Sequence, residues 1–163
     1  MSFQPGAPAP SFTLPTLTVD GPQLVSTDSY LGKKNLVLLF FPMAFTGVCT
    51  KEMCSITEDY SAYENLDAEV LGISGDNPFA QAAWAEKEGI KLTLLSDYEH
   101  EVTEMFKVSY PSFLPEKNLH MGGVPKRSAF VIDKEGRVRY SEVLESPGDL
   151  PNFDKIKEVL ESL

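Results

Sequence analysis

Three apolar runs in the first hundred residues predict strands of a sheet. Residues 35–41 form an almost unbroken apolar run with polar flanks, which is typical of a strand buried on both faces. Residues 68–74 repeat this pattern, and residues 92–97 form a shorter version of it. Pro42 cannot donate to a strand ladder, so we expect the first of these strands to end there.

Between these runs the apolar period changes to that of a helix. Residues 47–66 predict one helix, whose apolar positions recur about one turn apart at Met53, Ile56, Tyr60 and Tyr63. Asn77 and Pro78 supply a cap and a first-turn proline for a second helix that ends near Gly89. We expect its inner side to carry Phe79, Ala82, Ala83 and Trp84. Residues 99–108 predict a third helix, with an apolar stripe of Val102, Met105 and Phe106.

The two ends of the chain complete a layered pattern. Residues 11–14 and 23–26 alternate on either side of a turn and predict an N-terminal hairpin. Residues 128–133 and 138–144 predict a second antiparallel pair, followed by a closing amphipathic helix with Phe153, Ile156, Leu160 and Leu163. The alternation predicts an α/β fold with a central mixed sheet and helices on both faces. Residues 109–124, rich in Pro and Gly, are expected to form a loop over the active site or an oligomer contact.

Composition narrows the class of protein. With 163 residues and 42% hydrophobic content, the chain is expected to form a single domain over residues 1–163. The formal net charge of −10 argues against nucleic-acid binding, which requires clustered Lys and Arg. No apolar stretch approaches the roughly 20 residues that span a bilayer, and the first residues lack a signal-peptide pattern, so we expect a cytoplasmic protein without membrane contact.

The first buried strand and the helix after it form a setting for a reactive thiol. Thr46 is a candidate N-cap, which places Cys49 in the first turn of the helix. Unpaired backbone N–H groups and the positive end of the helix dipole favour the thiolate there. The Thr46 hydroxyl is placed to bind the sulfur or a substrate oxygen, and Pro42 to keep water from one side. The alternative is that Cys49 is a small buried hydrophobic residue.

The pattern Pro42-x-x-x-Thr46-x-x-Cys49 resembles the active-site signature of the peroxiredoxins, thiol peroxidases with a thioredoxin-like fold. Its neighbourhood, from Phe40 to Cys49, is similar to the AhpE-like subgroup, with the PrxQ (bacterioferritin-comigratory) subgroup close behind. The resemblance extends over nearly the whole chain. It includes an opening Gly6-Ala7-x-Ala9-Pro10, a middle Leu95-Ser96-Asp97 and a late Arg127-Ser128-Ala129-Phe130.

The resemblance implies a role for each residue of the motif. Cys49 would be the peroxidatic nucleophile, which attacks the O–O bond and becomes a sulfenic acid. Thr46 would hydrogen-bond the peroxide or the thiolate, and Pro42 would shield the sulfur. Arg127 would supply a fixed positive charge, and Glu52 would orient that arginine. Outside the resemblance, Arg127 is a surface arginine at a strand start and Glu52 a first-turn acid that complements the helix dipole.

Cys54 decides the subtype that the resemblance implies. The spacing Cys49-x4-Cys54 matches the PrxQ arrangement, in which a resolving cysteine lies five residues on, whereas AhpE-like proteins commonly rely on an external thiol. In a helix this spacing separates the Cα atoms by roughly 8–9 Å, beyond the limit of about 7 Å for a disulfide. We therefore expect a Cys49–Cys54 disulfide that forms after the first turns unwind; otherwise Cys54 is a buried apolar residue.

Two other functions compete with the peroxidase. A thioredoxin-type oxidoreductase usually has Cys-x-x-Cys, which the x4 spacing does not match. A redox sensor or chaperone-like protein would use Cys49 oxidation as a signal and would not turn over. No metal or other cofactor is expected, because two cysteines and two distant histidines form no recognised ligand spacing. The expected partners are a peroxide, a thioredoxin or glutaredoxin-like reductant, and a second copy of the chain in a homodimer, although a monomer is also compatible.

Overall fold

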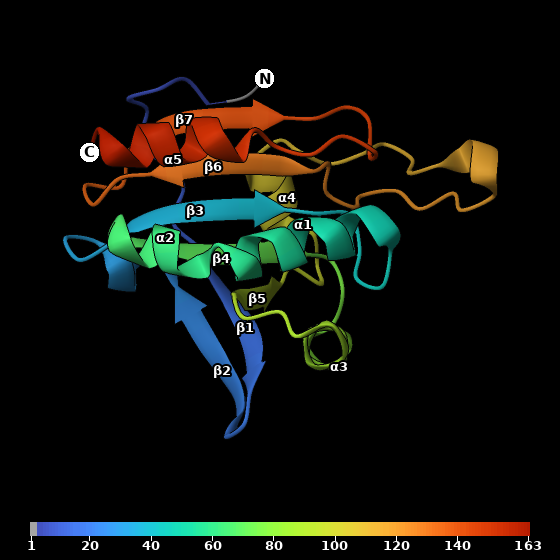
Figure 1. Ribbon diagram of the computed structural model, residues 1–163. Helices are drawn as coiled ribbons and strands as arrows, with labels where there is room; N and C mark the ends of the chain where they lie inside the picture. Colours follow the sequence, from blue (N-terminus) through green and yellow to red (C-terminus); the bar gives the residue numbers. More distant parts are fainter. Residues whose placement is uncertain (1–2) are drawn as a thin grey trace.

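A five-stranded sheet forms the centre of the protein, seen in a computed structural model that describes residues 3–163 (Figure 1). Its strand order is β5-β4-β3-β6-β7. The strands are β3 (Asn35–Phe40), β4 (Ala68–Ser74), β5 (Thr93–Ser96), β6 (Ser128–Ile132) and β7 (Val138–Val143). The two apolar runs that the sequence marked most clearly, β3 and β4, are adjacent, and every residue of β3 is buried.

The sheet combines parallel and antiparallel pairs, as predicted. β3 pairs in parallel with β4, and β4 with β5, through crossovers that contain helices. β6 pairs antiparallel with β3 and with β7. In the β3–β6 ladder Phe40 lies opposite Ser128, so the residue that precedes β6 stands beside the end of β3. This register places Arg127 next to the loop that follows β3.

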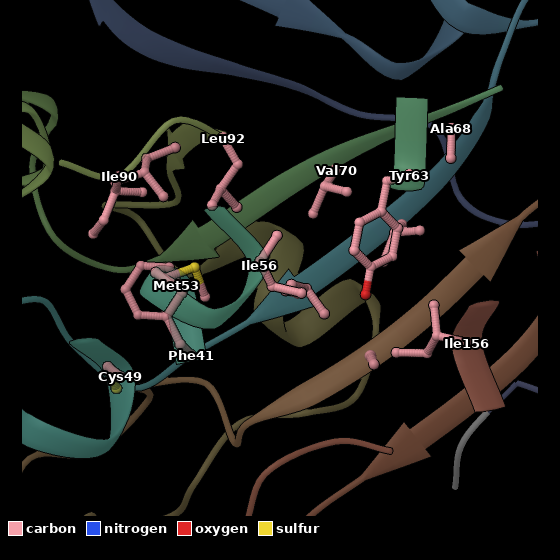
Figure 2. Packing of buried hydrophobic residues seen from close by; sticks show 14 of the residues in the cluster. Phe41, Cys49, Met53, Ile56, Tyr63, Ala68, Val70, Ile90, Leu92 and Ile156 are labelled. Carbon is pink, nitrogen blue, oxygen red and sulfur yellow. The ribbon is translucent and has the colours of Figure 1, made fainter. Parts of the chain in front are cut away.

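Helices cover both faces of the sheet. Helices α1 (Gly47–Glu58), α2 (Tyr60–Asn65) and α5 (Phe153–Glu161) pack on one face. There Met53, Ile56, Tyr63 and Ile156 share a core with Val37 and Leu39 of β3 and with Phe41, which follows β3 (Figure 2). Helix α4 (Glu101–Met105) and the N-terminal segment cover the other face, where Phe106 and Phe12 meet Leu36, Leu38 and Phe40. The side chains of β3 thus alternate between two hydrophobic cores.

The predicted N-terminal hairpin is present and forms a separate two-stranded sheet. Its strands are β1 (Thr13–Thr18) and β2 (Gly21–Ser26), followed by the short 3-10 helix η1 (Thr27–Tyr30). β1 lies against β5 and against helix α3 (Pro78–Glu88). Asn77 caps α3 as expected, since its side chain accepts a hydrogen bond from the Ala80 N–H at 2.8 Å. Among residues 3–163, no helix is long and apolar enough to cross a membrane.

Several helical predictions were wrong in detail. The expected helix 47–66 is two helices, because the backbone leaves helical geometry at Asp59, whose N–H group contacts the carbonyls of Ser55 and Ile56. The helix expected over residues 99–108 is limited to Glu101–Met105. In α3 the inner side is formed by Gln81 and Trp84, while Phe79 is 65% exposed.

Other side chains placed in the core by their apolar character are at the surface. They are Ala83, Met105 and Leu163. Ala83 and Met105 lie on helices that pack through only one side, and Leu163 lies beyond the end of α5. The buried residues of α4 are Val102 and Thr103. Apolar character alone therefore overestimated the width of the buried stripe on α3 and α4 and the length of the stripe on α5.

Residues 109–124 form an arm that extends from the body of the molecule beside the start of α1 (Figure 1). Isolated bridges join Ser109 to Pro125 and Phe113 to Met121, so the segment folds back on itself. The short 3-10 helix η2 (Pro115–Lys117) forms its tip. Because Phe113 is buried, at 5% exposure, the arm is packed against the body at its base.

Candidate active site

The predicted motif, Pro42 to Cys49, covers the loop between β3 and α1 and the first turn of α1. Pro42 is buried two residues after the end of β3, and α1 begins after Thr46, whose backbone is extended. Cys49 lies in the first turn of α1 and is 1% exposed. Figure 2 shows it at the edge of the hydrophobic core, near Phe41 and Met53.

Thr46 is the N-cap residue of α1, as predicted, but its side chain makes no capping hydrogen bond. Its hydroxyl donates to the carbonyl of Met43 at 2.8 Å, which closes the loop on itself. Phe45, between them, has a positive φ of 67°, a left-handed conformation that is strained for a bulky residue. The hydroxyl proton of Thr46 is thus engaged, and its oxygen is left to accept.

Arg127 lies beside the sulfur and is nearly inaccessible to water, at 1% exposure. Its Nη2 donates to Cys49 Sγ at 3.2 Å and to the carbonyl of Pro147 at 3.1 Å. Its Nη1 donates to Glu52 Oε1 at 2.7 Å, and Glu52 is fully buried. Cys49 and Glu52 lie three residues apart on α1, so one guanidinium spans one face of the helix.

Burial and charge act against each other in this group. Burial raises the pKa of Glu52 to about 7, although the neighbouring Arg127 charge works in the opposite direction. Burial by itself lowers the pKa of Arg127, but Glu52 and Cys49 raise it by more, so the guanidinium remains charged. A fixed cation therefore faces the sulfur without access to bulk water.

A cavity of about 250 Å³ opens at this cluster. One wall is the loop and first turn of α1, from Pro42 to Cys49, and another is Arg127 with Pro147 and Gly148. The arm supplies the remaining wall with Phe113, Leu114, Lys117 and Leu119. The arm therefore contributes to the same cavity as Cys49, which is one of the two locations expected for it.

Neighbouring groups hold the first turn of α1 and the arginine in place. The indole of Trp84 donates to the Thr50 hydroxyl at 3.0 Å, and that hydroxyl donates to the Thr46 carbonyl at 2.8 Å. On the other side, the Tyr110 hydroxyl donates to the Glu145 carbonyl at 2.9 Å and so ties the arm to the segment that carries Pro147. Sequence reasoning missed these supports. The Trp84–Thr50 and Tyr110–Glu145 hydrogen bonds each join residues at least 34 positions from one another in the chain, and only the Thr50–Thr46 bond is local.

Cys54 lies apart from the Cys49 cluster. It is half-buried, and its thiol contacts the carbonyl of Glu88, at the end of α3, at 3.8 Å. Burial, together with the charges of Glu88 and Glu58, raises the pKa of the Cys54 thiol. Both thiols are free, and α1 is continuous between them. Within residues 3–163 no group of three or more His, Cys, Asp or Glu side chains is arranged to hold a metal ion.

Comparison with known proteins assigns the family. The model of the AhpC/TSA family matches residues 5–141. Alkyl hydroperoxide reductase E of Mycobacterium tuberculosis is 35% identical over 146 residues, which cover 89% of this chain and 88% of that protein. The chloroplastic 2-cysteine peroxiredoxin of Chattonella marina is 32% identical over 150 residues, covering 88% and 72% of the two chains.

Solved structures agree with this assignment. The crystal structure of peroxidoxin BcpB from Mycobacterium tuberculosis superimposes with a TM-score of 0.82 at 29% identity, covering 99% of this chain and 98% of that one. The reduced 2-Cys peroxiredoxin of Plasmodium vivax gives the same TM-score at 26% identity, covering 98% and 81%. The chain therefore belongs to the AhpC/TSA family, the peroxiredoxins, and is a thiol-dependent peroxidase with a thioredoxin-like fold.

Proposed function

We propose that Cys49 is the peroxidatic residue of this enzyme and that Arg127 and Glu52 form its electrostatic support. The observation that carries the proposal is the 3.2 Å contact between Arg127 Nη2 and Cys49 Sγ in a water-poor cluster. A charged donor at this distance stabilises the thiolate and loses little strength to solvent. Glu52, through its 2.7 Å bond to Nη1, fixes the orientation of the guanidinium.

The reaction proceeds by attack of the thiolate on one oxygen of the O–O bond. An S–O bond forms as the O–O bond breaks, and the displaced oxygen takes up a proton and leaves as water or an alcohol. The sulfur is oxidised to a sulfenic acid and the peroxide is reduced. Charge that develops on the leaving oxygen is stabilised by the Arg127 donors and by N–H groups of the first turn of α1, which have no intrahelical carbonyl to bind.

Thr46 and Pro42 act on the peroxide and on water, respectively. Because the Thr46 hydroxyl donates to the Met43 carbonyl, its oxygen accepts a hydrogen bond from the O–H of the peroxide. This contact aligns the O–O bond with the sulfur. Pro42, buried next to the cavity, excludes water from the thiolate without offering a competing N–H donor.

The cavity supports organic hydroperoxides as substrates beside hydrogen peroxide. Its volume of about 250 Å³ is several times that of a water molecule, which occupies roughly 30 Å³ in the liquid. Phe113, Leu114 and Leu119 give its outer part an apolar surface for an alkyl group. The name of the Mycobacterium tuberculosis relative, an alkyl hydroperoxide reductase, agrees with this choice.

Cys54 resolves the sulfenic acid in our proposal, with a thioredoxin or glutaredoxin-like protein as the final reductant. The Cys54 thiol displaces hydroxide from Cys49 sulfenic acid, which yields a disulfide and water; a dithiol then reduces the disulfide. The first turns of α1 must unwind, because the two sulfurs contact different segments. A persistent Cys49 sulfenic acid with free Cys54, detected by mass spectrometry without reductant, would assign resolution to an external thiol.

Variants of the two cysteines test the proposal. Purified Cys49→Ser is expected to consume no peroxide, whereas Cys54→Ser is expected to consume one equivalent per Cys49 and then to depend on an added thiol. Stopped-flow measurement with hydrogen peroxide and cumene hydroperoxide separates the two substrates. Turnover at the parent rate by Cys49→Ser would overturn the assignment of the nucleophile.

A further inference from the structure

We propose that Asp76 is a positioning residue for peroxide reduction, acting through the backbone of the loop that carries Pro42 and Thr46. The proposal rests on the proposed role of Cys49 and extends it to a residue outside the cavity. One oxygen of the Asp76 carboxylate, Oδ2, accepts a hydrogen bond from the Ala44 N–H at 2.8 Å. Ala44 is 32 positions away in the chain and lies midway between Pro42 and Thr46.

The topology explains how this contact arises. β3 and β4 are parallel, so their carboxyl ends meet at one edge of the sheet. β3 leads into the loop of residues 41–46, and β4 leads into the turn that contains Asp76. The pairing of the strands continues past β3, since the Phe41 N–H donates to the Ile73 carbonyl at 3.0 Å.

A buried polar network fixes the Asp76 carboxylate. The Ser74 hydroxyl donates to the same Oδ2 at 2.7 Å, and Gln81 Nε2 donates to the Ser74 oxygen at 2.9 Å. The Ser96 hydroxyl donates to the Asp76 carbonyl at 2.6 Å. Ser74, Gln81 and Ser96 are each at most 1% exposed, so the acceptor that faces Ala44 is set by groups of β4, α3 and β5.

The loop requires such an anchor because its conformation is strained. Phe45 has a φ of 67° and is 55% exposed, so side-chain packing does not hold it in the left-handed region. Two hydrogen bonds hold the backbone around it: the Ala44 N–H donates to Asp76, and the Thr46 hydroxyl donates across Phe45 to the Met43 carbonyl. Loss of the first allows the loop to relax and carries the Thr46 oxygen away from the peroxide.

The test compares Asp76→Ala with the matched control Asn77→Ala. Asn77 occupies the same turn and its side chain caps α3, so its removal destabilises this region without touching Ala44. Two rates are measured at Cys49: reaction with hydrogen peroxide, which needs Thr46, and alkylation by iodoacetamide, which needs only the thiolate. Asp76→Ala is expected to slow the peroxide reaction between about 10- and 100-fold and to leave alkylation unchanged or faster.

Asp76→Asn retains an oxygen acceptor and is expected to recover most of the peroxide rate, while Asn77→Ala keeps both rates at the parent value. The proposal is overturned if Asp76→Ala reacts with peroxide like the parent, if both of its rates fall together, or if Asp76→Asn is as slow as Asp76→Ala. Failure of the proposed function would instead appear as peroxide turnover by Cys49→Ser.

Discussion

Thr46 shows how a single hydrogen bond assigns a donor and an acceptor in the reaction. Its hydroxyl proton is directed to the Met43 carbonyl, so only lone pairs remain for a ligand. A peroxide O–H is a donor that suits those lone pairs. The thiolate, which can only accept, is served by Arg127. In the proposed mechanism the two residues therefore bind different members of the reacting pair, Thr46 the peroxide and Arg127 the thiolate.

Replacement of Thr46 by valine tests this division. Thr46→Val keeps the shape of the side chain but removes the acceptor, and we expect kcat/KM for hydrogen peroxide to fall roughly 10²-fold. Thr46→Ser keeps the hydroxyl and is expected to retain most of the activity. The measurement is stopped-flow oxidation of Cys49, with circular dichroism to verify folding. Equal rates for the valine and serine variants would show that the hydroxyl does not bind the peroxide.

Glu52 gives a prediction about pH and stability. Burial raises its pKa from an ordinary value of 4.5 to about 7 in the folded protein, against the effect of Arg127. Between these pH values the folded state binds more protons than the unfolded state, so this group's contribution to stability is complete below about 4.5 and is lost as the pH rises to about 7. Glu52→Gln does not titrate and loses nothing over this range.

Urea unfolding of the parent and of Glu52→Gln across this pH range checks the sign. The difference in free energy of unfolding, parent minus variant, is expected to decrease as the pH rises through the window. Glu58→Gln, an exposed position on the same helix, is the control and should run parallel to the parent. Parallel curves for Glu52→Gln as well would mean that the buried carboxyl does not titrate there.

At the scale of elements, the spacing of apolar residues identified the buried face of a helix better than it identified where the helix begins and ends. Met53, Ile56, Tyr60 and Tyr63 keep a helical spacing across residue 59, and the first and last of these four are buried against the same core. That spacing reports which side faces the sheet and carries no information on whether the backbone is continuous. For this reason the spacing did not predict the break between α1 and α2 at Asp59. The exposed Phe79 and Met105 show the converse error, since apolar residues also occupy solvent-facing positions.

In the candidate site, the residues that lie close together in sequence were predictable, and those brought together by tertiary structure were less so. Pro42, Thr46 and Cys49 are local in sequence, so their grouping followed from the motif. Arg127 reaches Cys49 through the β3–β6 register, which the residue pattern alone did not specify. Asp76 stands at the carboxyl end of a parallel strand, a position that could have drawn attention to it. The Pro and Gly content of residues 109–124 indicated a loop at the active site or at an oligomer contact, but which of its side chains line the cavity depended on tertiary packing.

Helix α1 carries both cysteines, and its first turn is tied to α3 by Trp84 and Thr50. If disulfide formation requires that turn to unwind, removal of the tie should speed it. Thr50→Val is expected to raise the rate of Cys49–Cys54 disulfide formation several-fold, measured by quenched-flow thiol trapping and mass spectrometry. Thr57→Val removes a comparable contact at the other end of α1, with the Lys91 N–H, and should not change the rate. A slower disulfide step in Thr50→Val would contradict an unwinding barrier.

At the scale of the molecule, exposed apolar side chains gather at one edge. Phe45 is 55% exposed beside the start of α1, and Leu119 and Met121 on the arm are 42% and 37% exposed. Figure 1 shows the arm and the start of α1 at the same end of the protein. Apolar side chains grouped in this way are typical of an interface between proteins. We propose that this edge forms the contact of a homodimer, which also fixes the arm as a wall of the cavity.

Substitution at Phe45 tests the dimer. Phe45→Asp places a charge in the proposed contact while its residue type tolerates the left-handed backbone, so we expect a monomer in sedimentation experiments where the parent is a dimer. Phe79→Asp is the matched control: Phe79 is equally apolar and 65% exposed, but it lies on α3, away from the arm. Because the arm lines the cavity, the monomer should also lose activity toward cumene hydroperoxide more than toward hydrogen peroxide. A parent that sediments as a monomer, or a dimer that persists in Phe45→Asp, would place the contact elsewhere or remove it.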